Sequence, residues 1–162
     1  MQKFKILDIS GDVGIKAFGE SLKDAFINAA IGMYSLITDL DMVKEGKVID
    51  VSVERDSIEG LLVSWLNELI FHFDAYNFIG KKIVITEFTP SLTLPPRGGG
   101  AGGGEAEQLA SQQANRLNAS IYGEDFDPDR HERKLLVKAA TYHQLKIEKK
   151  NGKWEINVIF DI

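Results

Sequence analysis

The sequence contains no cysteine, which excludes disulfides, thiolate zinc sites and cysteine nucleophiles. Histidine is scarce as well: only His72, His131 and His143 occur, so a metal site would have to depend on oxygen ligands. The chain also lacks a basic surplus, because its formal net charge is -5. A free-standing nucleic-acid binder usually carries extra Lys and Arg to replace phosphate counterions. An acidic protein of this kind instead suits cation binding or docking on a basic partner.

Long apolar runs are missing too. No stretch approaches the roughly 20 apolar residues of a membrane span, and the first residues lack an apolar run of signal-peptide length. We therefore expect a cytoplasmic protein without a membrane contact. The 162 residues, with 44% hydrophobic content, predict one globular domain over 1–162.

One segment interrupts this domain, from about residue 89 to 118. It contains Pro95-Pro96 and a run of glycines over 98–104, broken only by Ala101. Proline lacks the N–H of a strand ladder and glycine is entropically costly to order, so we interpret 89–118 as a flexible insert at a hairpin tip. The glycines formally match a dinucleotide-binding pattern, but that pattern requires a preceding buried strand and a following helix.

Hydrophobic periodicity predicts two amphipathic helices and several strands. The first helix begins at Ser21 with Asp24 as a capping partner, and the second has Asp56 and Glu59 as its capping signal. The predicted strands cover 3–8, 13–19, 47–53, 81–88, about 119–123, 135–149 and 153–161. Helices and strands do not alternate regularly. The pattern therefore favours an α+β fold: a two-layer α/β sandwich with two main helices on a mostly antiparallel sheet of about six or seven strands.

The last two strands are joined by Asn151-Gly152, a strong signal for a two-residue hairpin turn. With constant pairing from that turn, Tyr142 lies directly opposite Asp161 on the outer face, together with Lys138. His143 lies opposite Phe160 on the core face, where we expect a satisfied core histidine. The same face holds Val137, Leu145, Ile147, Trp154, Ile156 and Val158. Of the other histidines, we expect His131 to cap a loop and His72 to lie at the margin of the core.

Acidic residues near the chain end suggest a site for a hard cation. Asp161 precedes Ile162, which places a side-chain carboxylate and an α-carboxylate one residue apart, and Asp12 in its glycine-flanked turn is the natural third group. Asp39, after the first helix, is an additional candidate ligand or simply the start of a loop. Acids are common at turns and chain ends, so a purely structural interpretation stays open. No Ser-His-Asp triad or catalytic carboxylate pair is evident.

Several segments, in order along the chain, together resemble the archease family. They are Leu7-Asp8-Ile9-Ser10-Gly11-Asp12-Val13-Gly14-Ile15, the Ala-Phe-Gly and Met-Tyr…Thr-Asp segments around the first helix, Leu61 to Leu69, Phe126-Asp127-Pro128…His131, Val137 to His143, and Phe160-Asp161-Ile162. The resemblance covers the whole chain except the insert. It departs from the family pattern at Ile9, where the family usually has His.

The resemblance implies an α/β sandwich with a divalent-cation site. Asp12 and Asp161 match the family's metal-binding acids, with the Ile162 carboxylate and Asp39 nearby, and Lys138 matches a family lysine close to that site. Ca²⁺ is the expected cation, with Mg²⁺, Mn²⁺ and Zn²⁺ as alternatives. Tyr142 is the other expected near-site residue for partner binding.

The function that the resemblance implies is that of a non-enzymatic activator. Such a protein promotes guanylylation and multiple turnover of an RtcB-type RNA ligase in tRNA splicing or RNA repair, without stable nucleic-acid binding of its own. One alternative is a general chaperone or modulator of nucleic-acid-processing enzymes. Another is a phosphoester hydrolase that uses a divalent metal to activate water.

Overall fold

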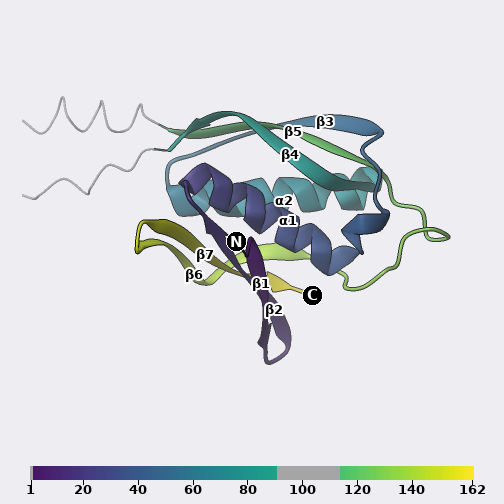
Figure 1. Ribbon diagram of the computed structural model, residues 1–162, viewed down its shortest axis with the longest axis horizontal. Helices are drawn as coiled ribbons and strands as arrows, with labels where there is room; N and C mark the ends of the chain where they lie inside the picture. Colours follow the sequence, from purple (N-terminus) through teal and green to yellow (C-terminus); the bar gives the residue numbers. More distant parts are fainter. Residues whose placement is uncertain (1, 91–113) are drawn as a thin grey trace, which may run out of the picture.

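The computed structural model describes residues 2–90 and 114–162, which form a layered α+β domain (Figure 1). The N-terminal half contains β1 (Phe4–Ile9), β2 (Asp12–Gly19), α1 (Leu22–Ile37), the short 3-10 helix η1 (Leu40–Met42) and β3 (Lys47–Arg55). The rest contains α2 (Ile58–Tyr76), β4 (Phe78–Thr89), β5 (Asn115–Asp125), β6 (Ala139–Lys150) and β7 (Lys153–Asp161).

The strands form two antiparallel sheets, with strand orders β1-β2-β7-β6 and β3-β5-β4. The two helices lie between these sheets (Figure 1). Helix α1 contacts β2 on one side and β4 on the other, and α2 contacts β6 and β3 in the same way. The predicted α+β class, with two main helices and antiparallel strands, is confirmed. Residue patterns alone placed the strands in one sheet, whereas the structure divides them between two.

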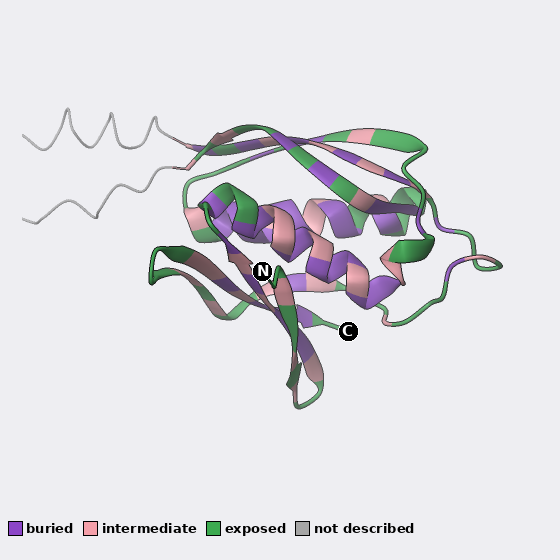
Figure 2. Cartoon of the chain, in the orientation of Figure 1, coloured by how far each residue is buried: buried purple, intermediate pink, exposed green. Residues whose placement is uncertain are grey.

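The core fills the space between the helices and both sheets (Figure 2). Helix α2 has no exposure at Leu61, Leu62, Trp65, Leu66 and Leu69. The indole N–H of Trp65 donates to the carbonyl of Phe26 in α1 at 3.1 Å, so a buried polar group is satisfied where the two helices meet. The apolar stripes read from the sequence are therefore the faces that build the core.

Both helices begin at serine caps. The Ser21 hydroxyl accepts a hydrogen bond from the backbone N–H of Asp24 at 3.0 Å, as predicted. At α2 the cap is Ser57 rather than Asp56, because Ser57 is the extended residue directly before the helix and its hydroxyl accepts from the Gly60 N–H at 2.9 Å. The predicted start of the second helix was thus one residue too early.

The two strands that flank the predicted insert are paired, from Phe78 with Asp125 to Thr89 with Arg116. Strand β5 begins at Asn115, so residues 115–118 belong to the sheet, and the predicted end of the insert at 118 was too late. Residue Leu117 is buried in the core, which explains why the strand continues there. Residues 91–113, the remainder of the predicted insert, lie outside the described residues.

The C-terminal hairpin starts as predicted. Asn151 and Gly152 have φ values of 52° and 79°, the left-handed pair that a type I′ turn requires. Regular pairing then runs from Lys150 with Lys153 to Lys146 with Asn157. The side chains of Ile156, Val158 and Phe160 point to the core without exposure, as the alternation predicted.

The predicted register fails beyond Lys146. The pairing shifts, so that Thr141 faces Ile159 and Ala139 faces Asp161, and the four residues 142–145 bulge out opposite Val158. Tyr142 is therefore not opposite Asp161. His143 is exposed on the bulge and is not a core residue. A constant two-residue period cannot reveal a bulge, because the extra residues change every later pairing.

Strand β6 is also shorter than predicted at its start. Residues 134 and 135 bond instead to the end of α1: the N–H of Lys134 donates to the Ile37 carbonyl at 2.9 Å and that of Leu135 to the Leu36 carbonyl at 3.0 Å. These bonds satisfy carbonyl groups that the last turn of a helix leaves free. The strand consequently begins at Ala139 rather than at 135.

Candidate metal and partner site

Two acidic residues meet at one end of the four-stranded sheet. Strand β2 begins at Asp12 and β7 ends at Asp161, and their antiparallel pairing reaches Val13 with Phe160 at this end. One further step in the same register brings Asp12 beside Asp161. Val13 and Phe160 are buried, so alternation directs both carboxylates to the opposite face of the sheet, away from the helices.

Strand β6 contributes the third segment to this end. Ala139 faces Asp161, and the backbone N–H of Lys138 donates to the Asp161 carbonyl at 2.8 Å. Both Asp161 and Lys138 are exposed, whereas Asp12 is partly buried. The structure thus brings Asp12, Asp161 and Lys138 together from three distant parts of the chain.

The β1–β2 turn explains how Asp12 reaches this position. Gly11 has a φ of +81°, a conformation that other residues rarely adopt, and it allows the chain to reverse directly before Asp12. Ile9 is the residue that faces Asp12 across this hairpin. Its apolar side chain offers neither a ligand nor a hydrogen bond to the carboxylate.

The chemistry of the acid pair favours a cation. Like charges on directly neighbouring strands repel each other, and carboxylate oxygens are the ligands that Ca²⁺ and Mg²⁺ prefer. Within the described residues, however, no three His, Asp or Glu side chains lie close enough to hold a metal ion. Two carboxylates therefore supply only part of the coordination sphere of such a cation, and the full ligand set stays a prediction.

Of the three other predicted site residues, Asp39 and Tyr142 lie in other elements of the fold, whereas Ile162 adjoins Asp161. Asp39 caps η1, where its Oδ1 accepts from the N–H of Asp41 at 3.1 Å, which gives it a structural role. Ile162 follows Asp161 and is 40% exposed. Tyr142 is 63% exposed on the bulge, and its hydroxyl lies 3.7 Å from the place that a Cβ on Gly60 would take, beside the first turn of α2.

A second charged cluster was not predicted. The carboxylate of Glu124, near the end of β5, accepts from the guanidinium of Arg130, with 2.9 Å to Nη1, and from the backbone N–H of Lys44 at 2.7 Å. Its side chain is only 14% exposed. The hydrogen bond with Arg130, assisted by those of Lys44 and His131, lowers the pKa of Glu124 to about 2, against the opposing effect of burial.

His131 completes this cluster from a buried position. Its Nδ1 accepts from the backbone N–H of Asp127 at 2.8 Å, so the ring proton of the neutral form lies on Nε2, which is 3.0 Å from Glu124. The expectation that His131 caps a loop is confirmed. The turn residues Asp127-Pro128 indicated that loop in the sequence. The role of Glu124 could not be predicted from its neighbours in the sequence, because its partners approach it only in the folded chain.

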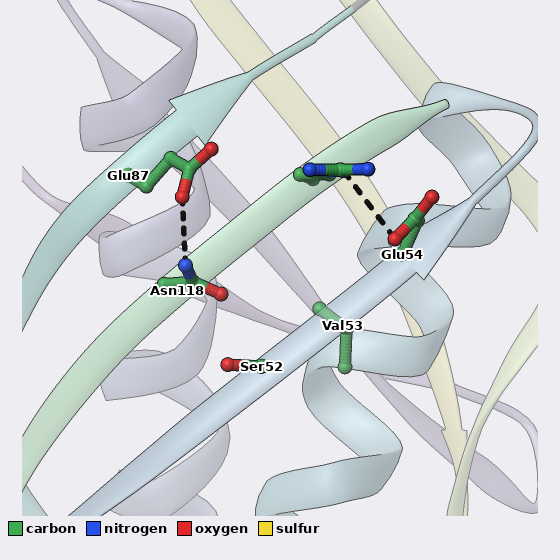
Figure 3. A pocket seen from close by; sticks show the side chains of 6 residues that line it. Ser52, Val53, Glu54, Glu87 and Asn118 are labelled. Atoms are coloured by element: carbon green, nitrogen blue, oxygen red, sulfur yellow. Dashed lines mark hydrogen bonds and ion pairs between the residues drawn. The ribbon is translucent and has the colours of Figure 1, made fainter. Parts of the chain in front are cut away.

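The outer face of β3-β5-β4 has a shallow polar depression (Figure 3). Its charged groups are paired with neighbours: Arg116 with Glu54 at 3.3 Å, and Glu87 with the side-chain amide of Asn118 at 2.8 Å. These contacts explain the depression as part of the sheet surface. None of the sequence-predicted site residues lines it.

Across residues 2–90 and 114–162, every helix is too short or too polar to cross a membrane.

Comparisons with known proteins agree over the full length of the chain. The model of the archease protein family matches residues 4–162. Curated relatives named protein archease include one from Sulfurisphaera tokodaii, 32% identical, and one from Pyrococcus abyssi, 31% identical, each covering 100% of both chains.

Solved structures agree as well. The solution structure of Methanobacterium thermoautotrophicum protein 1598 has a TM-score of 0.72 at 25% identity and covers 100% of both chains. A crystal structure from Thermotoga maritima, described as an archease and possible chaperone, has a TM-score of 0.57 at 15% identity, covers 98% of this chain and 96% of its own, and supports the fold alone. From the family match and these full-length relatives together, the chain belongs to the archease family.

Proposed function

We propose that this protein is a metal-binding accessory protein that activates an RtcB-type RNA ligase, promoting its guanylylation and repeated turnover in tRNA splicing or RNA repair. Membership of the archease family supports an accessory role rather than a catalytic one. The ligase itself is inferred from the family resemblance.

One observation carries the proposal: the register that brings Asp12 and Asp161 to adjoining strand ends beside Lys138. This end of the sheet is open, and Asp161 and Lys138 are exposed, so a partner protein can reach both. Asp12, Asp161 and the Ile162 carboxylate would hold the cation, with water in the remaining positions, and Ca²⁺ suits such a flexible oxygen set. A bound divalent cation would supply concentrated positive charge at this edge.

The decisive experiment measures guanylylation of the purified cognate ligase with divalent metal, with and without this protein. Asp12→Asn and Asp161→Asn keep the side-chain size but remove one charge each. We expect both variants to lose stimulation and to bind Ca²⁺ about tenfold more weakly or worse in calorimetry, because a carboxylate ligand is replaced by a neutral amide. Glu45→Gln, which neutralises an exposed acid in the loop before β3, is the matched control and should behave as wild type.

Full stimulation by both Asn variants would refute the metal-dependent mechanism. Stimulation that persists in the presence of a chelator would instead favour the general chaperone role. The Thermotoga maritima relative is described as a possible chaperone. Turnover of simple phosphoesters with Mn²⁺, lost in Asp161→Asn, would favour the hydrolase alternative.

A further inference from the structure

The C-terminal half of α2 carries an exposed aromatic cluster. Phe71 is 50% exposed and Tyr76 is 64% exposed. Their ring centroids are 5.8 Å apart, and the imidazole of His72 lies 5.7 Å from Phe71 and 5.6 Å from Tyr76. Three rings in mutual contact form a preorganised surface, because each restricts the others' rotamers.

This exposure is unusual for a helix that the sheets cover on two sides. The remaining turns of α2 bury their large side chains, and Trp65, Leu66 and Leu69 have no exposure at all. Two large aromatic side chains in water contribute nothing to the core. Contiguous exposed aromatic area on a folded domain commonly marks an interaction site.

The charged side chains of helix α2 itself are all acidic. Helix α2 (Ile58–Tyr76) contains Glu59, Glu68 and Asp74 but no Lys or Arg. Its last turn has no basic residue to balance the negative end of the helix dipole. Glu68 is 41% exposed and lies 3.4 Å from the Nε2 of His72, so a carboxylate borders the rings directly.

A cation on the neighbouring loop already has its own aromatic partner. Arg133 lies 5.0 Å above the ring of Phe126, and that ring is 5.7 Å from Phe73 in α2. Phe126 is buried and its backbone N–H donates to Asn77 at 2.7 Å, which fixes this arrangement at the end of the helix. An arginine of this chain therefore already stacks on an aromatic ring that packs against the last part of α2.

We propose that Phe71, His72 and Tyr76, with Glu68 and Asp74, form an arginine-binding surface for a protein partner. A guanidinium can stack on an exposed ring while its N–H groups bond to a carboxylate, a combination that fits arginine better than lysine. Nucleic acid is disfavoured as the occupant, because its phosphates would face two carboxylates and the negative end of α2. The occupant is therefore an exposed arginine segment of a partner protein.

The position of this arginine-binding surface relates it to the acid pair. Ala140 exchanges two hydrogen bonds with the side chain of Asn67, at 2.7 and 3.3 Å, and Tyr142 lies near Gly60. Strand β6 thus runs antiparallel to α2, and the chain before Ala140, including Lys138, extends toward the C-terminal half of the helix. The inference does not depend on the identity of a partner that docks at the acid pair.

The test uses the full chain and short synthetic peptides. A peptide with several arginines separated by Gly and Ser is titrated at low salt and followed by ¹H–¹⁵N NMR. Matched peptides carry lysine or glutamate in place of arginine. We expect amide shifts concentrated in residues 68–77, weaker binding of the lysine peptide and no binding of the glutamate peptide. Each exposed aromatic contributes about 2- to 5-fold in affinity, so Phe71→Ala with Tyr76→Ala should raise Kd about 4- to 25-fold.

Matched variants separate this site from general attraction to an acidic protein. Val48→Ala removes an apolar side chain that is 53% exposed on β3, and Asp50→Asn removes an exposed charge from the same strand. Both should keep wild-type affinity, whereas Asp74→Asn should lower it. The proposal is overturned by absence of binding, by equal binding to the aromatic double variant, or by an oligouridylate that shifts residues 68–77 as strongly as the arginine peptide does. These outcomes do not involve the ligase assay.

Discussion

Replacing Glu124 by glutamine tests how the charged cluster stabilises the fold. The carboxylate accepts from Arg130, Lys44 and His131, all of which are donors, so an amide NH₂ at this position would face at least one of them. The pKa of Glu124 falls from 4.5 to about 2 in the folded protein. At about 1.4 kcal/mol per pH unit this shift corresponds to a stabilisation on the order of 3 kcal/mol. Since water still reaches the side chain, we expect a loss of about 1–3 kcal/mol at pH 7.

The pH dependence of this loss follows from the sign of the shift. The folded pKa of Glu124 is depressed, so its stabilisation is fully present above the unfolded value of 4.5 and declines as the pH falls toward about 2. The difference in unfolding free energy between wild type and Glu124→Gln should therefore be largest near neutral pH and shrink below pH 4.5. Using the variant as reference cancels the titration of groups that do not contact Glu124.

Urea unfolding followed by circular dichroism measures this difference at a series of pH values. At pH 7 the loss corresponds to a decrease in Tm of roughly 3–10 °C for a chain of this size. Asp125→Asn is the matched control. Its ion pair with Lys47 has 59% and 57% exposed side chains, so its removal should cost less than about 1 kcal/mol. A difference for Glu124→Gln that is the same at pH 7 and at pH 3 would refute this reasoning.

Three further substitutions test local geometry. Gly123→Ala would place a Cβ 2.0 Å from the carbonyl oxygen of Ile79, which is a clash with backbone. Thermal unfolding should show a decrease of about 2–4 kcal/mol in the free energy of unfolding, and a decrease below about 1 kcal/mol would contradict this reasoning. Gly152→Ala, at a φ of +79°, should destabilise the C-terminal turn by about 1 kcal/mol in urea unfolding. Ser57→Ala should cost about 1 kcal/mol and Asp56→Ala much less, because only Ser57 caps α2; equal effects would argue against this assignment.

Local sequence features determined much of the architecture. The apolar stripes of both helices, the Ser21 cap and the Asn151-Gly152 turn depend on residues within a few positions of each other. Their physical causes, namely helical spacing, capping bonds and left-handed backbone, act over the same short range. These features could therefore be read without knowledge of the tertiary structure. The orientation of the Ile156 and Phe160 side chains toward the core follows from the same local alternation.

The tertiary structure decided the features that depend on distant partners. The bulge at 142–145 shifts the pairing of β6 with β7, and this moved Tyr142 and His143 away from their predicted positions. The Glu124 cluster needs the chain near residues 44 and 130 to fold against β5. The sequence by itself identified Asp12 and Asp161 as acids at a turn and near a chain end. Only the pairing of β2 with β7 brings them together, because strand register is set by contacts across the whole sheet.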